Sequence, residues 1–394
     1  MLRWSGTKVA ALAVSLTACG DGHHVPGVTV ADSAGIEIVT DTRSFTELPV
    51  RSVPGEPVQQ ILDEALYQVT VVQPLLDGRV AVGVDGAGAV LVFRDGERVS
   101  ELGRSGEGPG EFRNIQSLVH LPGDSLAVYD PRQHRLTVFP LGGGDPRVLS
   151  LGDVAPEDGW SRIHALEGSL VLVGEGGLGG GGESGIYRNT SPSVRIAFSG
   201  EMLATYGEFP GLEAVAANGM VGRAPFGALL ATATVRGQLV VGTAERPELL
   251  VYGPDGRLDR IIRWVDEDRA VTQKRMDQFV EFQLSLVPEE QASFLRGRLA
   301  SMPFAPEHPA HTKVLSAPDG SLWVGEYAGP EAEIPPGRRL APLRWLVFGA
   351  DGALTERIET PVGFVPMALE EGLVWGVYYD ELGVESVLAY HTER

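Results

Sequence analysis

The sequence has one cysteine in 394 residues, and this scarcity excludes both an internal disulfide framework and a metal site built from thiolates. Aromatic residues make up only 7% of the chain, and 32 basic residues face 52 acidic ones. The formal net charge of −20 argues against nucleic-acid binding, because contact with a phosphate backbone requires clustered cations.

What the chain has in abundance is glycine and proline, 51 and 27 residues. Such a composition is typical of many turns, and it favours short strands over long helices. Because 43% of the residues are hydrophobic, the chain is too apolar to be disordered.

Residues 1–18 read as an export signal. Arg3 and Lys8 give a positive start, and the apolar run 9–16 is far shorter than the roughly 20 residues of a spanning helix. The run Leu-Thr-Ala-Cys that ends at Cys19 resembles the bacterial lipobox, in which the cysteine becomes a lipid-modified, palmitate-bearing N-terminus. We therefore expect residues 19–34 to be a lipidated N-terminus and flexible tether. A plain secretory signal with an incidental cysteine is the alternative.

Six units of one pattern fill the rest of the chain. Each unit has a glycine-containing turn before an apolar strand and then a second apolar strand that ends in an aromatic residue. Asp-Gly between apolar runs is a strong hairpin signal, because glycine adopts positive φ without a steric cost. The aromatic residues that mark the six units are Phe93, Phe139, Phe198, Tyr252, Phe348 and Tyr390.

This repeat predicts an all-β fold, a six-bladed β-propeller over residues 35–394. The sixth unit stops after its third strand, at 386–390, so one outer strand is missing. We expect the N-terminal segment 35–39 to supply that strand, closing the ring with strands from both chain ends. An array of two-sheet sandwiches is the alternative architecture.

One unit carries a family resemblance. Gly-Glu-Gly-Pro-Gly-Glu-Phe at 106–112 is followed by two apolar strands, Leu-Ala-Val-Tyr-Asp at 126–130 and His-Arg-Leu-Thr-Val-Phe at 134–139. This unit resembles an NHL repeat. The start Asp-Ser-Ala-Gly-Ile at 32–36 and the end 375–390 resemble six-bladed propeller lipoproteins of bacteria, and this second resemblance spans nearly the whole mature chain. The resemblance implies a fold and a place in the cell envelope, and it implies no activity.

Long insertions fall on one face of the predicted ring. The segments 174–191 and 328–343 are loops between second and third strands, and 206–225 and 265–311 connect successive blades. Repeat proteins place such insertions on the face that binds. Within the longest insertion, about 266–302 between blades 4 and 5, we expect two amphipathic helices that dock as a lid or serve as a structural prop.

Cationic and aromatic residues on the same face suggest an interface or a site for an anionic ligand. Surface solubility also explains them. The candidates for ligand binding are Arg104, Arg223, Tyr327, Arg338 and Tyr379.

The alternative is an enzyme. NHL-type propellers include lyases and hydrolases that hold a metal at the central channel, and His120, His164 and Glu326 are the candidate ligands under that resemblance. Packed, hydrogen-bonded core histidines are the alternative for the first two, since zinc requires a third ligand. No Gly-x-Ser-x-Gly or His-Glu-x-x-His motif is present, so no catalytic residue is assigned.

We expect a monomeric lipoprotein of the cell envelope without a bound cofactor. It would be anchored to a membrane by its lipid and would bind an unknown envelope protein or small ligand. The membrane and leaflet stay open.

Overall fold

The structure is a computed structural model that describes residues 26–392 apart from 54, 152–158, 175, 179–183, 218, 266–267, 328 and 330–341. Its strands are joined by the turns that the glycine pattern predicts. In the hairpin between β7 (Ala89–Arg94) and β8 (Glu97–Leu102), Asp95 and Gly96 have φ of 51° and 84°. Two successive positive φ values match the right-handed twist of the flanking strands.

The described residues form six sheets whose four blade strands pair antiparallel, one blade after another along the chain, so the fold is a β-propeller. Blade 1 consists of β5 (Val69–Pro74), β6 (Arg79–Val84), β7 and β8. Blade 2 consists of β11 (Ser117–Leu121), β12 (Ser125–Asp130), β13 (Arg135–Pro140) and β14 (Arg147–Ser150). Blade 3 consists of β15 (Trp160–Leu166), β16 (Ser169–Gly174), β17 (Gly185–Ala197) and β18 (Met202–Ala217). Blade 4 consists of β20 (Ala231–Val235), β21 (Gln238–Gly242), β22 (Glu248–Tyr252) and β23 (Leu258–Trp264). Blade 5 consists of β24 (Val314–Ser316), β25 (Leu322–Gly325), β26 (Arg344–Phe348) and β27 (Leu354–Glu359). Blade 6 consists of β28 (Phe364–Glu370), β29 (Leu373–Tyr379), β30 (Glu385–His391) and the N-terminal β4 (Gln59–Ile61). Between blades 1 and 2, β9 (Arg104–Ser105) and β10 (Glu111–Phe112) form a short parallel pair.

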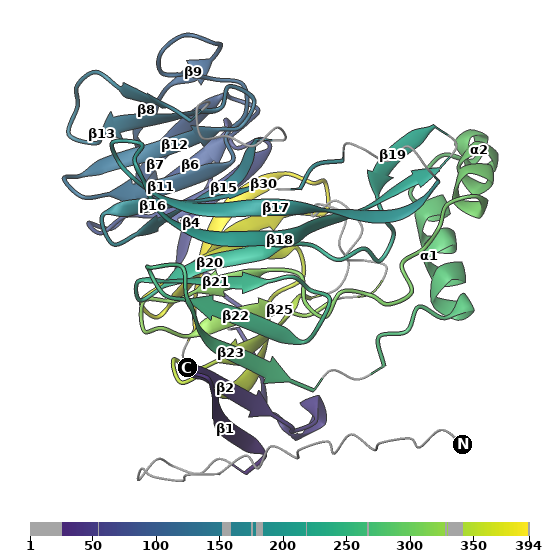
Figure 1. The fold of residues 1–394 in the computed structure, drawn as a ribbon. Coiled ribbons are helices and arrows are strands. Elements are labelled where there is room, and N and C mark those ends of the chain that lie inside the picture. Colours follow the sequence, from purple (N-terminus) through teal and green to yellow (C-terminus); the bar gives the residue numbers. More distant parts are fainter. Residues whose placement is uncertain are drawn as a thin grey trace, which may run out of the picture.

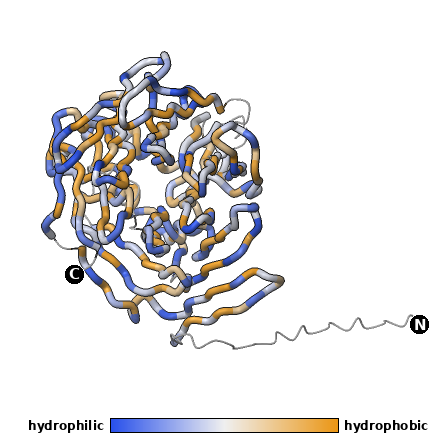
Figure 2. The backbone as a smooth tube through the Cα atoms, turned by 90° about the vertical axis from the view of Figure 1, so that its left-hand side faces the viewer, coloured by the Kyte–Doolittle hydropathy of each residue, from blue (hydrophilic) through white to orange (hydrophobic). Residues whose placement is uncertain are grey.

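The first strand of each blade contacts the first strand of the next, from β5 through β11, β15, β20, β24 and β28 back to β5. Figure 2 looks along the axis of this ring and shows the blades arranged around a common centre. The core lies between neighbouring blades. Leu91 of blade 1 and Trp375 of blade 6, for example, are at most 1% exposed and belong to one cluster.

The ring closes with strands from both ends of the chain, but the segment predicted to do so is the wrong one. Residues 59–61, not 35–39, complete blade 6, where Ile61 lies opposite Val387 of β30. The segment expected there forms β2 (Ile36–Asp41), which pairs in parallel with β23 of blade 4. An alternating apolar strand suits any outer edge, so the sequence pattern does not say which blade it joins.

The N-terminal segment therefore runs along the outer edges of three successive blades, and we call residues 28–61 the strap. It adds β1 (Val28–Ser33) and β2 to blade 4, β3 (Val50–Ser52) to blade 5, and β4 to blade 6. A single helical turn, Phe45–Glu47, lies between β2 and β3. Because β1 is a paired strand, the folded part begins inside the range 19–34 that the sequence pattern assigns to a tether.

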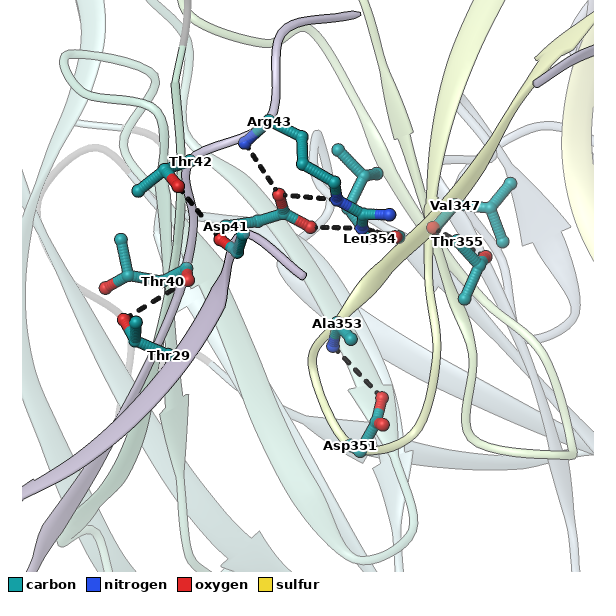
Figure 3. A network of polar contacts seen from close by, with 11 residues as sticks. Thr29, Thr40, Asp41, Thr42, Arg43, Val347, Asp351, Ala353, Leu354 and Thr355 are labelled. Atoms are coloured by element: carbon teal, nitrogen blue, oxygen red, sulfur yellow. Dashed lines mark hydrogen bonds and ion pairs between the residues drawn. The ribbon is translucent and has the colours of Figure 1, made fainter. Parts of the chain in front are cut away.

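Arginine side chains fasten the strap to the blades. The guanidinium of Arg43 donates to the carboxylate of Asp41, which is 1% exposed, and to the carbonyl oxygen of Leu354 in blade 5 (Figure 3). Arg51 of β3 donates to both carboxylate oxygens of Glu356 at 2.9 and 2.8 Å. Bidentate pairs of this kind fix position as well as adding attraction.

The predicted helical insertion between blades 4 and 5 is present as α1 (Gln273–Ser285) and α2 (Glu289–Ala300). Thr272 caps α1 by accepting a hydrogen bond from the backbone N–H of Arg275. Phe279 and Leu299 are buried, but Phe294, an apolar residue of the second amphipathic helix, is 74% exposed. Figure 1 shows both helices beyond the right-hand ends of the blade strands.

Two predicted loops are largely strands. β16 pairs only with residues 193–197 of β17, so 185–192 projects beyond blade 3 together with its partner β18. β19 (Met220–Arg223) pairs with the end of β18 and continues this projection. We call the paired residues 185–192 and 208–217 together with β19 the outer hairpin, and Figure 1 shows β19 reaching toward α2. Much of 174–191 and 206–225 thus builds a sheet extension.

Ring closure by β4 yields a stability prediction. Ile61→Ala removes a side chain that is 2% exposed in the cluster joining blades 6 and 1, and we expect it to lower the free energy of unfolding by about 2–4 kcal/mol. Leu62→Ala, at a 68% exposed neighbour, is the matched control and should change it by less than about 0.5 kcal/mol. Urea unfolding of both variants measures the difference. Equal midpoints would contradict a closing role for β4.

Candidate functional site

The two faces of the ring differ in their connections. One face carries tight turns between first and second strands and between third and fourth strands. The other, which we call the insertion-bearing face, carries the outer hairpin, the two helices and the remaining connections.

Exposed large hydrophobic side chains gather on the insertion-bearing face. Of the seventeen such side chains among the described residues, nine lie in its connections and one, Leu76, lies in a tight turn of the opposite face. The remaining seven lie on or next to outer strands. The nine are Leu62, Tyr67, Leu178, Val221, Val265, Phe294, Val362, Leu382 and Val384.

The helices rest on an aromatic cluster of their own. Phe226, in the turn after the outer hairpin, is 1% exposed, and its ring centroid lies 5.4 Å from that of Phe279 and 5.9 Å from that of Phe304. Its φ of 61° is a strained conformation for a bulky residue, and it persists only where surrounding contacts enforce it. The helices are thus a packed lid, which we define as α1 and α2 together.

Two mostly buried arginines fix the outer hairpin and the segment before the lid to blade 4. Arg188 of the outer hairpin donates to the carbonyl oxygen of Thr243 at 2.6 Å and to Glu245 at 2.9 Å. Arg269, just before α1, donates to the carbonyl oxygen of Glu245 at 2.8 Å. Because both guanidinium groups are mostly buried, removing an acceptor would leave a costly unpaired charge.

His311, after the lid, completes this anchor. Its side chain is fully buried and Nε2 accepts a hydrogen bond from the backbone N–H of Ala244 at 3.2 Å. That acceptor role places the proton of the neutral ring on Nδ1. Burial lowers the pKa of His311 to about 3, with the nearby cations Arg188 and Arg269 acting in the same direction.

The predicted ligand-binding residues are dispersed over this face. Arg104 is 79% exposed and its guanidinium lies 2.6 Å from Glu111, between blades 1 and 2. Arg223 ends β19 of the outer hairpin, and Tyr379 ends β29 in blade 6. Tyr327 alone joins the lid cluster, where its ring stacks on His308 at 4.9 Å. Arg338 and Cys19 lie outside the described residues.

The three candidate metal ligands are not grouped into a metal site in the described residues, and two of them hydrogen-bond to other side chains. His120 and His164 do lie on adjacent first strands, but His164 Nε2 is 2.9 Å from Thr232 Oγ1, and burial lowers the pKa of His164 to about 4. Both carboxylate oxygens of Glu326 accept hydrogen bonds from Arg357, at 2.9 and 2.7 Å. Across the described ranges, no three histidine, cysteine or acidic side chains are grouped as a metal site requires.

Sequence reasoning misses the residues that hold the lid. The sequence places Arg188 in a loop, and its isolated position gives no signal of the three carbonyl oxygens that it reaches. Phe226 stands in Pro-Phe-Gly, a turn-like context that does not indicate a buried aromatic residue. The strand alternation from 185 to 197 is the one available signal for the outer hairpin.

No protein-family model matches the chain, and no curated protein matches it. Among solved structures, a member of the DUF4221 family from Bacteroides vulgatus is similar with a TM-score of 0.51 at 10% identity, over 85% of this chain and 96% of that one. A protein from Bacteroides fragilis named as exported gives a TM-score of 0.49 at 10% identity, over 88% of this chain and 100% of its own. Virginiamycin B lyase from Staphylococcus aureus gives 0.44 at 10% identity, over 85% and 98%. The first of these likenesses supports the propeller fold alone.

Neither helix in the described part of the chain is long and apolar enough to cross a membrane.

The depressed pKa of His311 predicts a pH-dependent stability. The unfolded chain takes up a proton at this histidine near pH 6.5, whereas the folded chain resists protonation down to about pH 3, so stability falls as the pH is lowered through that window. We expect His311→Leu to reduce the loss of unfolding free energy between pH 7 and pH 5 by about 2 kcal/mol. Urea unfolding at pH 8, 7 and 5 measures it. Between pH 8 and 7 the two proteins should show the same dependence, and equal losses down to pH 5 would rule out a buried neutral His311.

Proposed function

We propose that this protein is a lipid-anchored propeller of the bacterial envelope that binds a ligand or partner protein through its insertion-bearing face. One observation carries the proposal: exposed apolar side chains concentrate on the face that carries the outer hairpin and the lid. Exposed apolar side chains that cluster on one face of a folded domain mark an interaction site, whereas single ones scattered over a surface do not.

The packing of this face supports binding rather than a loose covering. The lid packs on Phe226 and Tyr327, Arg269 fixes the segment before it to blade 4, and Arg188 fixes the outer hairpin to the same blade. A surface that is already ordered loses little conformational entropy when a partner binds. The insertions thus suit a preformed recognition surface.

The proposed address rests on the N-terminal sequence. Leu-Thr-Ala-Cys ending at Cys19 supports lipid modification of that cysteine, and two or more acyl chains would anchor the protein stably.

The loop at 106–112 supports membership among NHL-type propellers. There, Arg135 donates to the carbonyl oxygens of Glu107 at 2.9 Å and Gly108 at 2.6 Å.

Charged substitutions on the two faces test the proposal. Leu382→Asp places a carboxylate on the insertion-bearing face, and Leu76→Asp places one on the opposite face at a similarly exposed position, 88% against 93%. We expect cross-linked envelope partners, or stabilisation by a bound small ligand, to be lost with Leu382→Asp and kept with Leu76→Asp. Loss with both variants or with neither would argue against recognition by this face.

The anchor is tested separately. Cys19→Ser should abolish incorporation of labelled palmitate and release the protein from the membrane fraction, because the sequence offers no other cysteine. Palmitate labelling that persists in this variant would overturn lipidation at Cys19.

A further inference from the structure

The strap fixes where the chain enters the fold. Val28 of β1 lies opposite Asp41 of β2, and Asp41 lies beside Trp264 of β23. Trp264 is the last residue of its strand, and the next residue, Val265, begins the connection to the lid. The N-terminal end of β1 is therefore at the rim of the insertion-bearing face.

The entry point is held by hydrogen bonds. The backbone N–H of Thr42 donates to the carbonyl oxygen of Gly27 at 2.8 Å, and the Thr42 hydroxyl donates to the same oxygen at 3.0 Å. Gly27 is the eighth residue after Cys19, and eight residues span at most about 29 Å. If Cys19 is lipidated, as the proposed function holds, the bilayer lies within that reach of this rim.

Four of the exposed apolar residues of the same face lie on neighbouring connections at the end of blade 6. Leu382 and Val384 lie in the loop between β29 and β30 and are 88% and 59% exposed. Leu62 and Tyr67 follow β4, the strand that pairs with β30, and are 68% and 64% exposed. Four large apolar side chains on neighbouring connections thus face water in the described part of the chain.

The lid adds a second apolar contact of a kind suited to a lipid surface. Phe294 of α2 is 74% exposed, and the exposed Arg298 lies one turn further along the same helix. The two helices together carry four basic and four acidic residues, in a chain whose net charge is −20. The lid is thus far less acidic than the chain as a whole, which lowers its repulsion from anionic lipids.

We propose that the partner of the insertion-bearing face is the phospholipid bilayer that holds the anchor, so that the lid and the end of blade 6 rest on the lipid headgroups and the tight-turn face points away. The short tether brings this rim to the membrane, and the apolar side chains select the orientation. This inference rests on the lipid anchor of the proposed function. In this orientation Leu76, on the tight-turn face, stays in water.

Site-directed spin labels test the orientation in the lipidated mature protein. Because Cys19 is the only cysteine and its thiol is consumed by the lipid, Phe294→Cys, Leu382→Cys and Leu76→Cys each introduce a single label site. Each protein is reconstituted in vesicles of phosphatidylethanolamine and phosphatidylglycerol. We expect labels at 294 and 382 to become more accessible to oxygen and less accessible to a water-soluble nickel complex than in the matching Cys19→Ser protein kept free of lipid. The label at 76 should stay in water in both states.

Other occupants of the face give different signals, and each would overturn the proposal. Labels at 294 and 382 that remain as water-accessible as the label at 76 exclude contact with lipid. Spin–spin coupling between copies, independent of lipid, would assign the face to a second copy of the chain. Protection that appears only when a soluble envelope protein is added would assign it to that protein.

A charge variant makes the test independent of the labelled residue. A label at Val362→Cys, 49% exposed on the same face, reports the orientation while Leu382→Asp disrupts the contact. We expect Leu382→Asp to return this label to water and Leu76→Asp to leave it at the lipid surface; a label that responds to neither variant would overturn the proposed contact. Retained palmitate labelling in both variants shows that the anchor is intact, so loss of orientation is distinguished from loss of the anchor.

Discussion

The whole ring depends on one antiparallel pairing between the two ends of the chain, that of β4 with β30. Blade 6 has only three strands from its own part of the sequence, so without β4 the backbone groups along β30 would form an open edge. Ile61 also enters the cluster shared by blades 6 and 1. Closure therefore combines hydrogen bonds within blade 6 with apolar packing between blades 6 and 1. Because the blades form a ring, this contact also holds the other blade interfaces together.

The strap that leads to β4 has a second consequence, because it also fixes the start of the fold in space. Parallel pairing of β2 with β23 makes the N-terminal end of β1 level with the rim that leads into the lid. Arg43 and Arg51 then hold the strap against blade 5. One segment thus closes the ring and places the proposed tether beside the elaborated face.

That face is ordered by buried polar groups as much as by apolar packing. Arg188 of the outer hairpin and Arg269 at the start of the helical insertion reach the same loop of blade 4, and His311 accepts a hydrogen bond from the backbone of that loop. Buried cations are stable only where acceptors surround them, so each arginine specifies the position of the chain that supplies its carbonyl oxygens. The aromatic cluster around Phe226 supplies the apolar part.

The sequence by itself determined the repeat, the blade order and the presence of two helices, because turn chemistry and apolar periodicity are local properties that survive in a single chain. It also located the insertions on one face. Only the tertiary structure decided which N-terminal strand joins which blade, that 185–192 and the end of β18 form a paired hairpin, and that Phe294 points outward. These outcomes depend on pairing partners distant in sequence, and a strand's own alternation does not name its partner. For the same reason the sequence could not predict that Arg104, Arg223 and Tyr379 lie on separate connections. A repeat pattern indicates the face on which a residue lies but not its neighbours across the ring.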